Sequence, residues 1–399
     1  MQTVLRASKG SETSLQRTAD VSVIMPVYNE ADHIEVAVRS VLDNDLAPER
    51  LEVLVVDGMS TDGTREIVCE LAKEHPRVRL VDNREKTVPY ALNRGLGVAT
   101  GEVIIRVDGH ATVAPDFVRS CLAELDAHPE CGCVGGPIEN VNVNETARAI
   151  SLAMSSPFGV GNARFRLGDY EGYVDTLAFG AYRREVFDRV GRFDELLTRN
   201  QDDEFNYRLA RAGIRIWLSP RIRSRYVVRS SFAKLFRQYY QYGYWKVYVN
   251  RKHGAVTSLR QLVPVVFMVA LGLCLLAAPV VPAARWALLL VVSVYLAGAL
   301  GFALIASRGA TPSGATSSGA TSSGAASSSD RPLGDRPPGA RARAARARAV
   351  RSRRPATIAR IVAAFALLHS GYGLGYLEGV LRFLVLGLRP AQRNTELSR

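Results

Sequence analysis

The apolar stretch VSVIMPV at residues 21–27, ending in a proline turn, decides the fold. The runs EVLVV at 52–56 and EVIIRV at 102–107 are similar, and a shorter strand is expected at 78–82. Strands that are apolar at nearly every position are typical of parallel sheets covered on both faces. These segments therefore predict the buried strands of a parallel sheet.

Helical patterns separate the strands. Residues 32–43 carry apolar side chains at helical spacing, and further helices are expected at 65–74 and 89–99. This alternation predicts an α/β fold with a doubly wound, mostly parallel sheet. The later part of the domain is predicted to hold strands at 133–135, 176–182 and 214–218 and a helix at 203–212.

The composition changes after residue 252. We expect a catalytic domain at 21–252, followed by an interfacial segment and two transmembrane helices at 253–306. Residues 357–390 form a third transmembrane or re-entrant helix that packs through Gly371, Gly373 and Gly375. The C-terminal region is thus all-α. Residues 1–20, 307–356 and 391–399 are expected to be a disordered tail, a Gly/Ala/Ser and Arg-rich linker, and a second tail.

The charge pattern indicates a membrane partner. The net charge is +13, and the basic clusters flank apolar segments, which favours anionic lipid headgroups over nucleic acid. Residues 1–20 lack the apolar core of a signal peptide, and the five cysteines are expected to be free thiols. We therefore predict a multi-pass protein of the inner (plasma) membrane with a cytoplasmic catalytic domain.

Two carboxylates follow predicted strands, Asp57 after the second and Asp108 after the fourth. Ligands of doubly wound sheets bind beyond the carboxyl ends of the strands. One carboxylate there can accept hydrogen bonds from a base or ribose, and the other can hold Mg²⁺ or Mn²⁺ against a diphosphate. The alternative for either residue is a turn or helix cap.

An ordered set of motifs points to a family. PVYNE at 26–30, VVDG at 55–58, STDGT at 60–64, ALNRG at 91–95, ATG at 99–101 and DGH at 108–110 occur in this order. Over residues 21–252 the chain resembles family 2 glycosyltransferases with the GT-A fold. Its membrane region resembles the bacterial exopolysaccharide branch of that family, of the succinoglycan glucosyltransferase type.

The resemblance implies a donor site and a metal. The implied donor contacts are Pro26, Tyr28, Glu30, Asp57, Lys86 and Asp108. Asp108 and His110 stand where the family has its Asp-x-Asp metal motif, with His110 in place of the second carboxylate. Imidazole is a good ligand for Mn²⁺ and a poorer one for Mg²⁺, so the divalent cation is left as either.

A second acidic constellation is QDDE at 201–204. Adjacent carboxylates repel one another, which raises the pKa of at least one and makes it a candidate general base. The resemblance implies Asp202 as the base, with Asp203 and Glu204 as alternatives. An acidic first turn favoured by the helix dipole is the other interpretation.

Residues 237–246 read RQYYQYGYWK and supply the last candidates. Aromatic faces stack on sugars and cations meet diphosphates, so Arg237, Tyr240, Trp245 and Lys246 are predicted to serve the acceptor or diphosphate. An aromatic and basic belt at the membrane surface is the competing interpretation.

Together these features predict an inverting glycosyltransferase. It would move a sugar from a nucleotide diphosphate sugar to a polyprenyl-diphosphate-linked saccharide in cell-surface or exopolysaccharide synthesis. The alternatives are transfer to polyprenyl monophosphate itself, and a membrane-tethered protein that binds nucleotide sugars without turnover.

Overall fold

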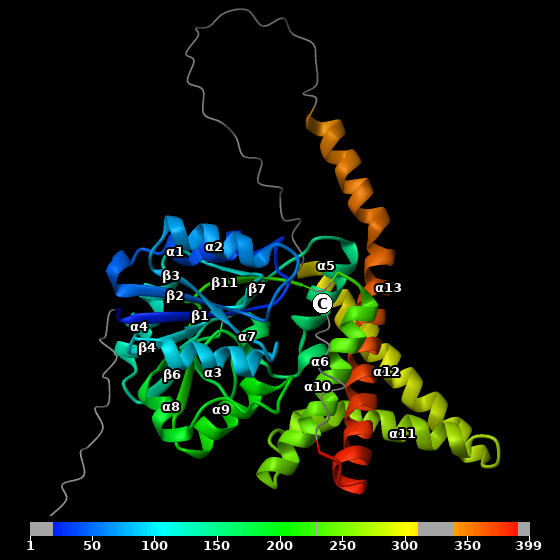
Figure 1. Ribbon diagram of the computed structural model, residues 1–399. Helices are drawn as coiled ribbons and strands as arrows, with labels where there is room; N and C mark the ends of the chain where they lie inside the picture. The colour runs from blue at the N-terminus through cyan, green and yellow to red at the C-terminus, as the bar shows by residue number, and fades with distance from the viewer. Residues whose placement is uncertain (1–18, 169, 229, 310–338, 390–399) are drawn as a thin grey trace, which may run out of the picture.

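The computed structural model describes residues 19–309, except 169 and 229, and residues 339–389. An α/β domain lies beside a group of long helices (Figure 1). The predicted tails, apart from residues 19 and 20, and the first part of the predicted linker lie outside the described residues.

In the described residues, eight strands form the main sheet in the order β3-β2-β1-β4-β9-β6-β10-β8. The first four are parallel, whereas β9 runs antiparallel between β4 and β6, and β8 is an antiparallel edge strand. The predicted mostly parallel α/β sheet is confirmed. The strands are β1 (Val21–Val27), β2 (Leu51–Asp57), β3 (Val78–Asp82), β4 (Val103–Arg106), β6 (Cys131–Gly135), β8 (Gly172–Tyr173), β9 (Ala181–Arg183) and β10 (Arg215–Leu218).

Helices cover both faces of this sheet, as Figure 1 shows. All seven residues of β2 are buried because Val53 and Val55 pack on one face and Leu54 and Val56 on the other. The first face is covered by α1 (Ile34–Leu42), α2 (Thr64–Glu74) and α4 (Phe117–Ala127). The second is covered by α3 (Val88–Val98), α8 (Glu185–Val190) and α9 (Gln201–Arg211).

The predicted strand at 176–182 is largely wrong. Only Ala181 and Tyr182 of that range pair, within β9. Residues 176–179 instead line a cavity, so their apolar side chains are buried without a strand partner.

A smaller sheet lies next to the main one. Its strands, in the order β5-β11-β7, are β5 (Ala111–Val113), β11 (Ser224–Val227) and β7 (Ile138–Val141). The short helix η1 (Pro48–Arg50) precedes β2, while α5 (Glu145–Met154), α6 (Pro157–Val160) and α7 (Arg164–Leu167) lead toward the helical region. Pairing of β11 with β5 brings Tyr226 beside the residues that follow β4.

The helical region begins with α10 (Phe232–His253), which packs along α13 (Gly339–Gly379). A Cβ on Gly243 would come 2.0 Å from the carbonyl oxygen of Tyr372, and one on Gly375 would come 2.0 Å from that of Tyr240. The two helices therefore touch backbone to backbone. Of the three predicted glycines, Gly373 meets the first apolar helix, whereas Gly371 and Gly375 meet α10.

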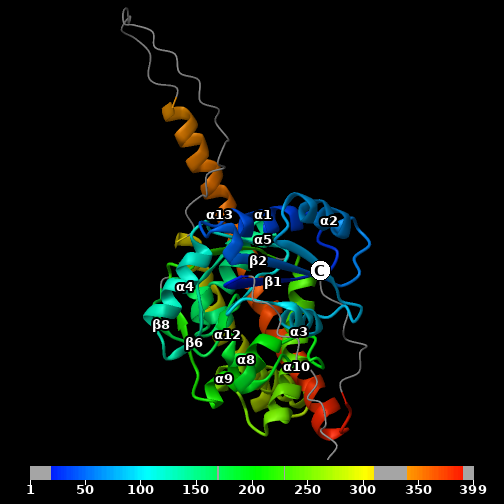
Figure 2. The ribbon, with the colours of Figure 1, turned by 60° about the vertical axis from the view of Figure 1, so that its left-hand side comes forward.

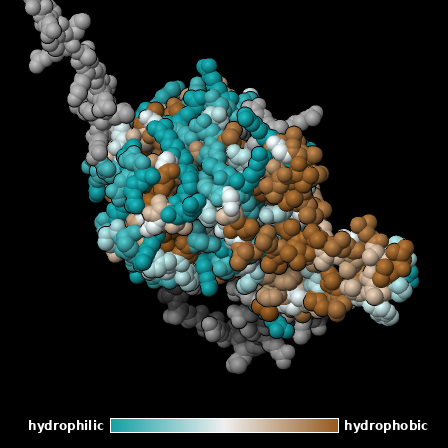
Figure 3. Space-filling model, turned by 90° about the horizontal axis from the view of Figure 1, so that it is seen from below, coloured by the Kyte–Doolittle hydropathy of each residue, from teal (hydrophilic) through white to brown (hydrophobic). Residues whose placement is uncertain are grey.

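Three helical segments in the described residues are long and apolar enough to cross a membrane: Leu259–Ala277, Pro282–Arg308 and Pro355–Val385. They comprise η2 (Leu259–Leu262) with α11 (Val263–Ala277), α12 (Pro282–Gly309), and α13 with η3 (Val380–Val385). Figure 3 shows the hydrophobic surface over the α11–α12 hairpin, where Leu276 and Val280 are about four-fifths exposed. A surface this apolar needs a nonaqueous partner.

The third candidate span runs through α13 and continues into the π-helix η3. Its helical backbone starts at Gly339, where the sequence analysis predicts a linker, and its first turns extend beyond the domain (Figure 2). Alanine and arginine, which dominate residues 340–354, have high helix propensity, and this explains the difference.

Candidate active site

A cavity of about 1030 Å³ starts at the carboxyl ends of β1 and β4 and continues between the long helices. Pro26 and Asp108 line it at the sheet, and Asp202 and Asp203 line its middle. Its far side is apolar and is formed by α6, α11, α12 and α13. One continuous space thus joins the predicted donor edge of the sheet to the candidate membrane spans.

The STDGT motif holds the loop after β1 in place. Ser60 Oγ accepts the backbone N–H of Asn29 at 2.7 Å, and Thr64 Oγ1 accepts that of Glu30 at 2.8 Å. In the described residues, the four non-glycine positions with positive φ are Asn29, Met59, Lys86 and Asn200. Asn29, Met59 and Lys86 lie in the loops after β1, β2 and β3, and Asn200 precedes α9 and lines the cavity; strained backbone of this kind is typical of ligand sites.

Asp57 also supports the loop after β1, through its hydrogen bond with Ser60. Its buried carboxylate accepts hydrogen bonds from Ser60 Oγ at 2.5 Å and from Arg65 Nη1 at 2.7 Å. Lys86 Nζ lies 5.8 Å from the ring centre of Tyr28. Of the six predicted donor contacts, Pro26, Glu30 and Asp108 line the cavity, whereas Tyr28, Asp57 and Lys86 lie outside its described lining.

Arg106, on the last residue of β4, links two carboxylates from different elements. Its guanidinium donates to Asp108 Oδ1 at 2.9 Å and forms an ion pair with Asp202. Burial alone would lower the pKa of Arg106, but the two carboxylates outweigh burial and raise it. Arg106 therefore stays charged and joins Asp108 on the sheet to Asp202 on α9.

His110 has one nitrogen occupied and one available. Its Nδ1 lies 2.9 Å from Glu30 Oε1, and its ring packs against Tyr226 with centres 4.9 Å apart. Its buried Nε2 has no hydrogen-bond partner among the described residues. A carboxylate on Nδ1 fixes the proton there and leaves Nε2 as an electron-pair donor, the usual arrangement behind a metal-binding histidine.

These side chains fit a cation that is shared with a substrate. The described residues hold no group of three or more His, Cys, Asp or Glu side chains arranged to bind a metal ion. Asp108 and His110 nevertheless both line the cavity. Mg²⁺ and Mn²⁺ bound with a nucleotide diphosphate take several ligands from phosphate and water, so two protein ligands suffice.

The three adjacent carboxylates of α9 have three separate environments. Asp202 pairs with Arg106, and Asp203 pairs with the buried Lys246 of α10. Burial raises the pKa of Asp202, although Arg106 opposes that rise. Burial also lowers the pKa of Lys246, against the influence of Asp203. Asp202 and Asp203 both line the cavity and remain candidates for the base.

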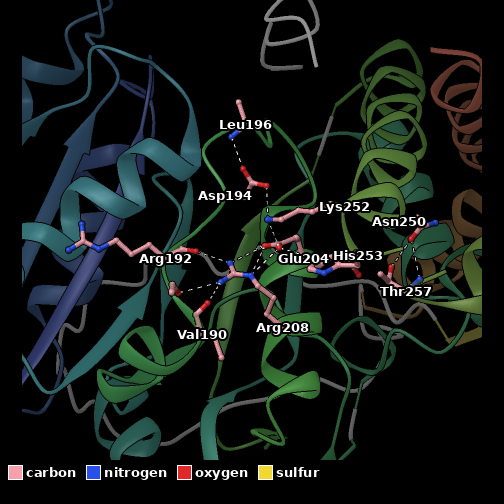
Figure 4. Close-up of polar contacts among 12 residues, drawn as sticks. Val190, Arg192, Asp194, Leu196, Glu204, Arg208, Asn250, Lys252, His253 and Thr257 are labelled. Carbon is pink, nitrogen blue, oxygen red and sulfur yellow. Dashed lines mark hydrogen bonds and ion pairs between the residues drawn. The ribbon is translucent and has the colours of Figure 1, made fainter. Parts of the chain in front are cut away.

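Glu204 lies outside the described lining of the cavity, as the centre of an ionic cluster (Figure 4). Its carboxylate contacts Arg208 at 3.0 Å, Lys252 at 2.8 Å and His253 at 3.0 Å. Burial favours a raised pKa for Glu204, but the hydrogen bonds from Arg208 and Lys252 lower it overall. A carboxylate so occupied is poorly suited to accept a proton from a substrate, so this alternative base does not fit the geometry.

None of the four predicted α10 residues belongs to the described lining of the cavity. Arg237 is exposed, Tyr240 packs on Gly371 and Gly375, and Trp245 packs near Phe383. Lys246 is held by Asp203. The residues of α10 that do line the cavity are Gln238, Tyr239 and Tyr242, because packing against α13 sets the rotation of the helix.

Sequence reasoning missed several cavity residues. Arg106 had a recognisable signal, since a charge inside the apolar run at 102–107 is unusual for a buried strand. Arg166, Arg199, Arg260 and Tyr372 had none, because they come from separate elements that meet only in the fold.

Comparisons with known proteins agree on one family. The family model described as glycosyl transferase family 2 matches residues 22–191. Succinoglycan biosynthesis protein ExoA of Rhizobium meliloti is 32% identical over 290 residues, which cover 72% of this chain and 86% of that protein.

A second relative comes from Methanococcus voltae and is named dolichyl N-acetyl-alpha-D-glucosaminyl phosphate 3-beta-D-2,3-diacetamido-2,3-dideoxy-beta-D-glucuronosyltransferase. It is 29% identical over 239 residues, covering 58% of this chain and 74% of that protein. Among solved structures, mannosyltransferase PcManGT from Pyrobaculum calidifontis, in complex with GDP-Man and Mn²⁺, aligns with a TM-score of 0.48. It is 22% identical, and the alignment covers 88% of each chain.

Proposed function

The chain belongs to glycosyl transferase family 2 and is a glycosyltransferase, and on that premise we propose that its acceptor is a saccharide linked to a polyprenyl diphosphate. The donor is a nucleotide diphosphate sugar. The observation that carries this proposal is the single cavity that runs from Asp108 and Asp202 to the candidate spans. A lipid-linked acceptor needs a path from the membrane to the donor, and this cavity offers one.

The proposed reaction is one direct displacement. An acceptor hydroxyl oxygen forms a bond to the anomeric carbon while the bond from that carbon to the diphosphate oxygen breaks. Asp202 accepts the hydroxyl proton, and the nucleoside diphosphate leaves with the bonding electrons. The configuration at the anomeric carbon inverts, so an α-linked donor yields a β-linked product.

Residues around Asp202 support its role as the base. Its raised pKa makes it a better proton acceptor than an exposed aspartate, and Arg106 orients it by an ion pair. Asp203 is likewise held in an ion pair, with Lys246, and it stays the alternative base.

Asp108 and His110 would hold the divalent cation, and Glu30 would keep Nε2 of His110 available. A bound cation offsets the negative charge that develops on the departing diphosphate. Pro26 and Glu30 would contact the donor at the same end of the cavity, with Tyr28, Asp57 and Lys86 toward the nucleoside.

The relatives support a lipid-linked sugar as the acceptor and a role in polysaccharide synthesis. The name of the Methanococcus voltae relative specifies a dolichyl phosphate-linked sugar as its acceptor, and the Rhizobium relative is named for succinoglycan synthesis. We therefore propose a role in cell-surface or exopolysaccharide synthesis. Basic clusters beside the spans favour the inner membrane with the catalytic domain in the cytoplasm.

Release of nucleoside diphosphate tests the proposal. Detergent-solubilised full-length protein is incubated with a panel of sugar nucleotides, with Mn²⁺, Mg²⁺ or EDTA, and with or without a polyprenyl diphosphate hexose. We expect metal-dependent release with one donor that requires the lipid-linked hexose. Transfer only to bare polyprenyl monophosphate would support the alternative acceptor, and donor binding without release in every condition would support a binding protein.

A further inference from the structure

Among the described residues, the cavity is lined by three arginines in addition to Arg106. Arg166 comes from α7, Arg199 precedes α9, and Arg260 belongs to η2 at the start of the first candidate span. They lie far apart in the sequence. Their side chains line the same cavity as Asp202 and as the apolar residues of α11 and α12, and we refer to their part of the lining as the positively charged zone.

Two buried donors in this zone lack acceptors. Nη1 of Arg166 and the hydroxyl of Tyr372 have no hydrogen-bond partner within the part of the chain that the structure describes. Both residues line the cavity, and Tyr372 is only 9% exposed. Buried polar groups in folded proteins are normally paired, so these two donors indicate a missing acceptor.

The other two arginines are already positioned. Arg260 contacts Asn162 at 2.6 Å and Asp175 at 2.7 Å, and Arg199 Nε donates to Gln241 Oε1 at 3.0 Å. Such contacts restrain long side chains before a ligand arrives, which reduces the entropy lost on binding. The fork of an arginine matches the oxygens of phosphate, which makes a phosphate group the acceptor that best fits the zone.

The adjoining part of the cavity is apolar. Phe158, Phe267, Tyr295 and Phe302 line it and come from α6, α11 and α12. Their rings pack together, with centres of Phe267 and Tyr295 4.5 Å apart and those of Phe158 and Phe302 5.3 Å apart. A positively charged zone next to an aromatic one suits a ligand whose phosphate is attached to a hydrocarbon chain.

We propose that Arg166, Arg199, Arg260 and Tyr372 bind the phosphate that links the acceptor saccharide to its lipid, with the lipid chain along the aromatic side. This inference rests on the proposed lipid-linked acceptor. It adds that the enzyme recognises the phosphate itself. The saccharide attached to that phosphate then extends toward Asp202.

The test compares two acceptors and two arginines in full-length protein. The acceptors are a short-chain polyprenyl diphosphate hexose and the free hexose methyl glycoside. Arg166→Gln removes the guanidinium whose Nη1 lacks an acceptor. Arg164→Gln is the matched control, because Arg164 lies in the same short helix, is exposed and stacks on Tyr170 at 4.8 Å.

We expect Arg166→Gln to raise KM for the lipid-linked acceptor about tenfold or more, since one charge-assisted hydrogen bond is lost. Its KM for the donor and its rate with the methyl glycoside stay at the wild-type values. Arg164→Gln leaves the KM for the lipid-linked acceptor and the rate with the methyl glycoside unchanged. Tyr372→Phe, which keeps the ring, gives a smaller rise of the same kind. Equal KM values for wild type and Arg166→Gln with the lipid-linked acceptor overturn the inference.

Two further arms identify the source of the phosphate. Polyprenyl monophosphate hexose, tested alongside the diphosphate, reports which ester the zone prefers. A higher KM for either ester in Arg166→Gln than in wild type supports the site. Vesicles of phosphatidylglycerol are compared with phosphatidylcholine as competitors. If phosphatidylglycerol competes with the acceptor in wild type but not in Arg166→Gln, the zone binds bulk headgroups and the inference is wrong. Failure of the wild-type enzyme to use any lipid-linked acceptor removes the proposed function instead.

Discussion

The carboxyl edge of the sheet and helix α10 both contain residues predicted for the site. They differ in how many of those residues line the cavity. At the sheet edge, Pro26 at the end of β1 and Glu30 and Asp108 in the loops line the cavity, whereas Tyr28, Asp57 and Lys86 lie outside its described lining. In α10, Arg237 is exposed, Tyr240 and Trp245 pack against α13 and η3, and Lys246 pairs with Asp203, while neighbours such as Tyr239 line the cavity instead. A residue at the end of a buried strand is positioned by that strand, whereas a residue on a helix depends on which face meets a partner.

Helix α9 also shows that the partner of a helical residue depends on the face of the helix on which it lies. Asp202, Asp203 and Glu204 are adjacent in sequence and chemically similar. Successive helical positions point about 100° apart, so the three carboxylates reach β4, α10 and the end of α10 respectively. Adjacent residues therefore receive different roles from partners that are distant in sequence.

The largest expected effect separates the α9 carboxylates. Asp202→Asn should lower kcat about 10³-fold while donor affinity is kept, because the proton acceptor is lost. Asp203→Asn should retain at least tenfold more activity than Asp202→Asn. Single-turnover experiments measure the rates of both variants, and calorimetry measures their affinity for the donor. An equal loss in the two variants would assign the base to Asp203 or to neither.

The pH profile sharpens that assignment. A general base must be deprotonated, and burial raises the pKa of Asp202, so kcat/KM should rise at a pH above the usual aspartate range. Arg106 opposes the shift, so Arg106→Gln should move the rise to still higher pH. An unchanged profile in Arg106→Gln would mean that another group controls the acid limb.

The next effect concerns stability. Glu204→Gln should cost about 3–5 kcal/mol at neutral pH, because Arg208, Lys252 and His253 lose a buried carboxylate. The folded pKa of Glu204 is lowered, so its contribution is complete above the ordinary value of 4.5 and is lost as pH falls through the folded value. Thermal unfolding of wild type and Glu204→Gln across this range measures it.

Glu139→Gln is the control for that measurement. Glu139 pairs with Arg225 at 2.9 Å on the surface, where both side chains are about two-thirds exposed. Exposed pairs contribute little, so the change should stay within about 1 kcal/mol. If the two substitutions cost the same, the cluster around Glu204 does not hold α9 and α10 together.

A smaller effect tests the contact between α10 and α13. Gly375→Ala should destabilise the protein by about 1–3 kcal/mol, since its Cβ would meet the backbone oxygen of Tyr240. Gly272→Ala, in α11, meets nothing within 4 Å and should be neutral or slightly stabilising. Unfolding temperatures in detergent compare the two. Equal temperatures would contradict the close backbone contact.

The smallest effect concerns the sheet-edge loops. Ser60→Ala removes the hydroxyl that joins Asp57 to the backbone of Asn29, at a cost of about 1 kcal/mol. We expect a few-fold rise in KM for the donor with little change in kcat. Ser370→Ala, whose hydroxyl bonds only within its own helix among the described contacts, serves as the control. A donor KM that does not change would separate this loop from donor binding.

Much of the fold could be predicted from the sequence because its signals are local. Strands β1, β2 and β4 are mostly apolar, and the apolar segments after residue 258 are long enough to be recognised as candidate membrane spans from sequence. The segment at 176–182 failed because an apolar run can line a cavity as well as form a strand. The helical backbone from Gly339 was missed because low-complexity composition was given more weight than helix propensity.

The sequence by itself determined the family, the sheet, the strand end that bears Asp57 and the loop that bears Asp108, since each follows from residues close together along the chain. Only the tertiary structure decided that Arg106 joins Asp108 to Asp202, that Glu204 belongs to a separate cluster, and that Arg166 and Tyr372 line one cavity. These relations join residues separated by tens to hundreds of positions. They depend on helix rotation and close packing, which local patterns do not encode.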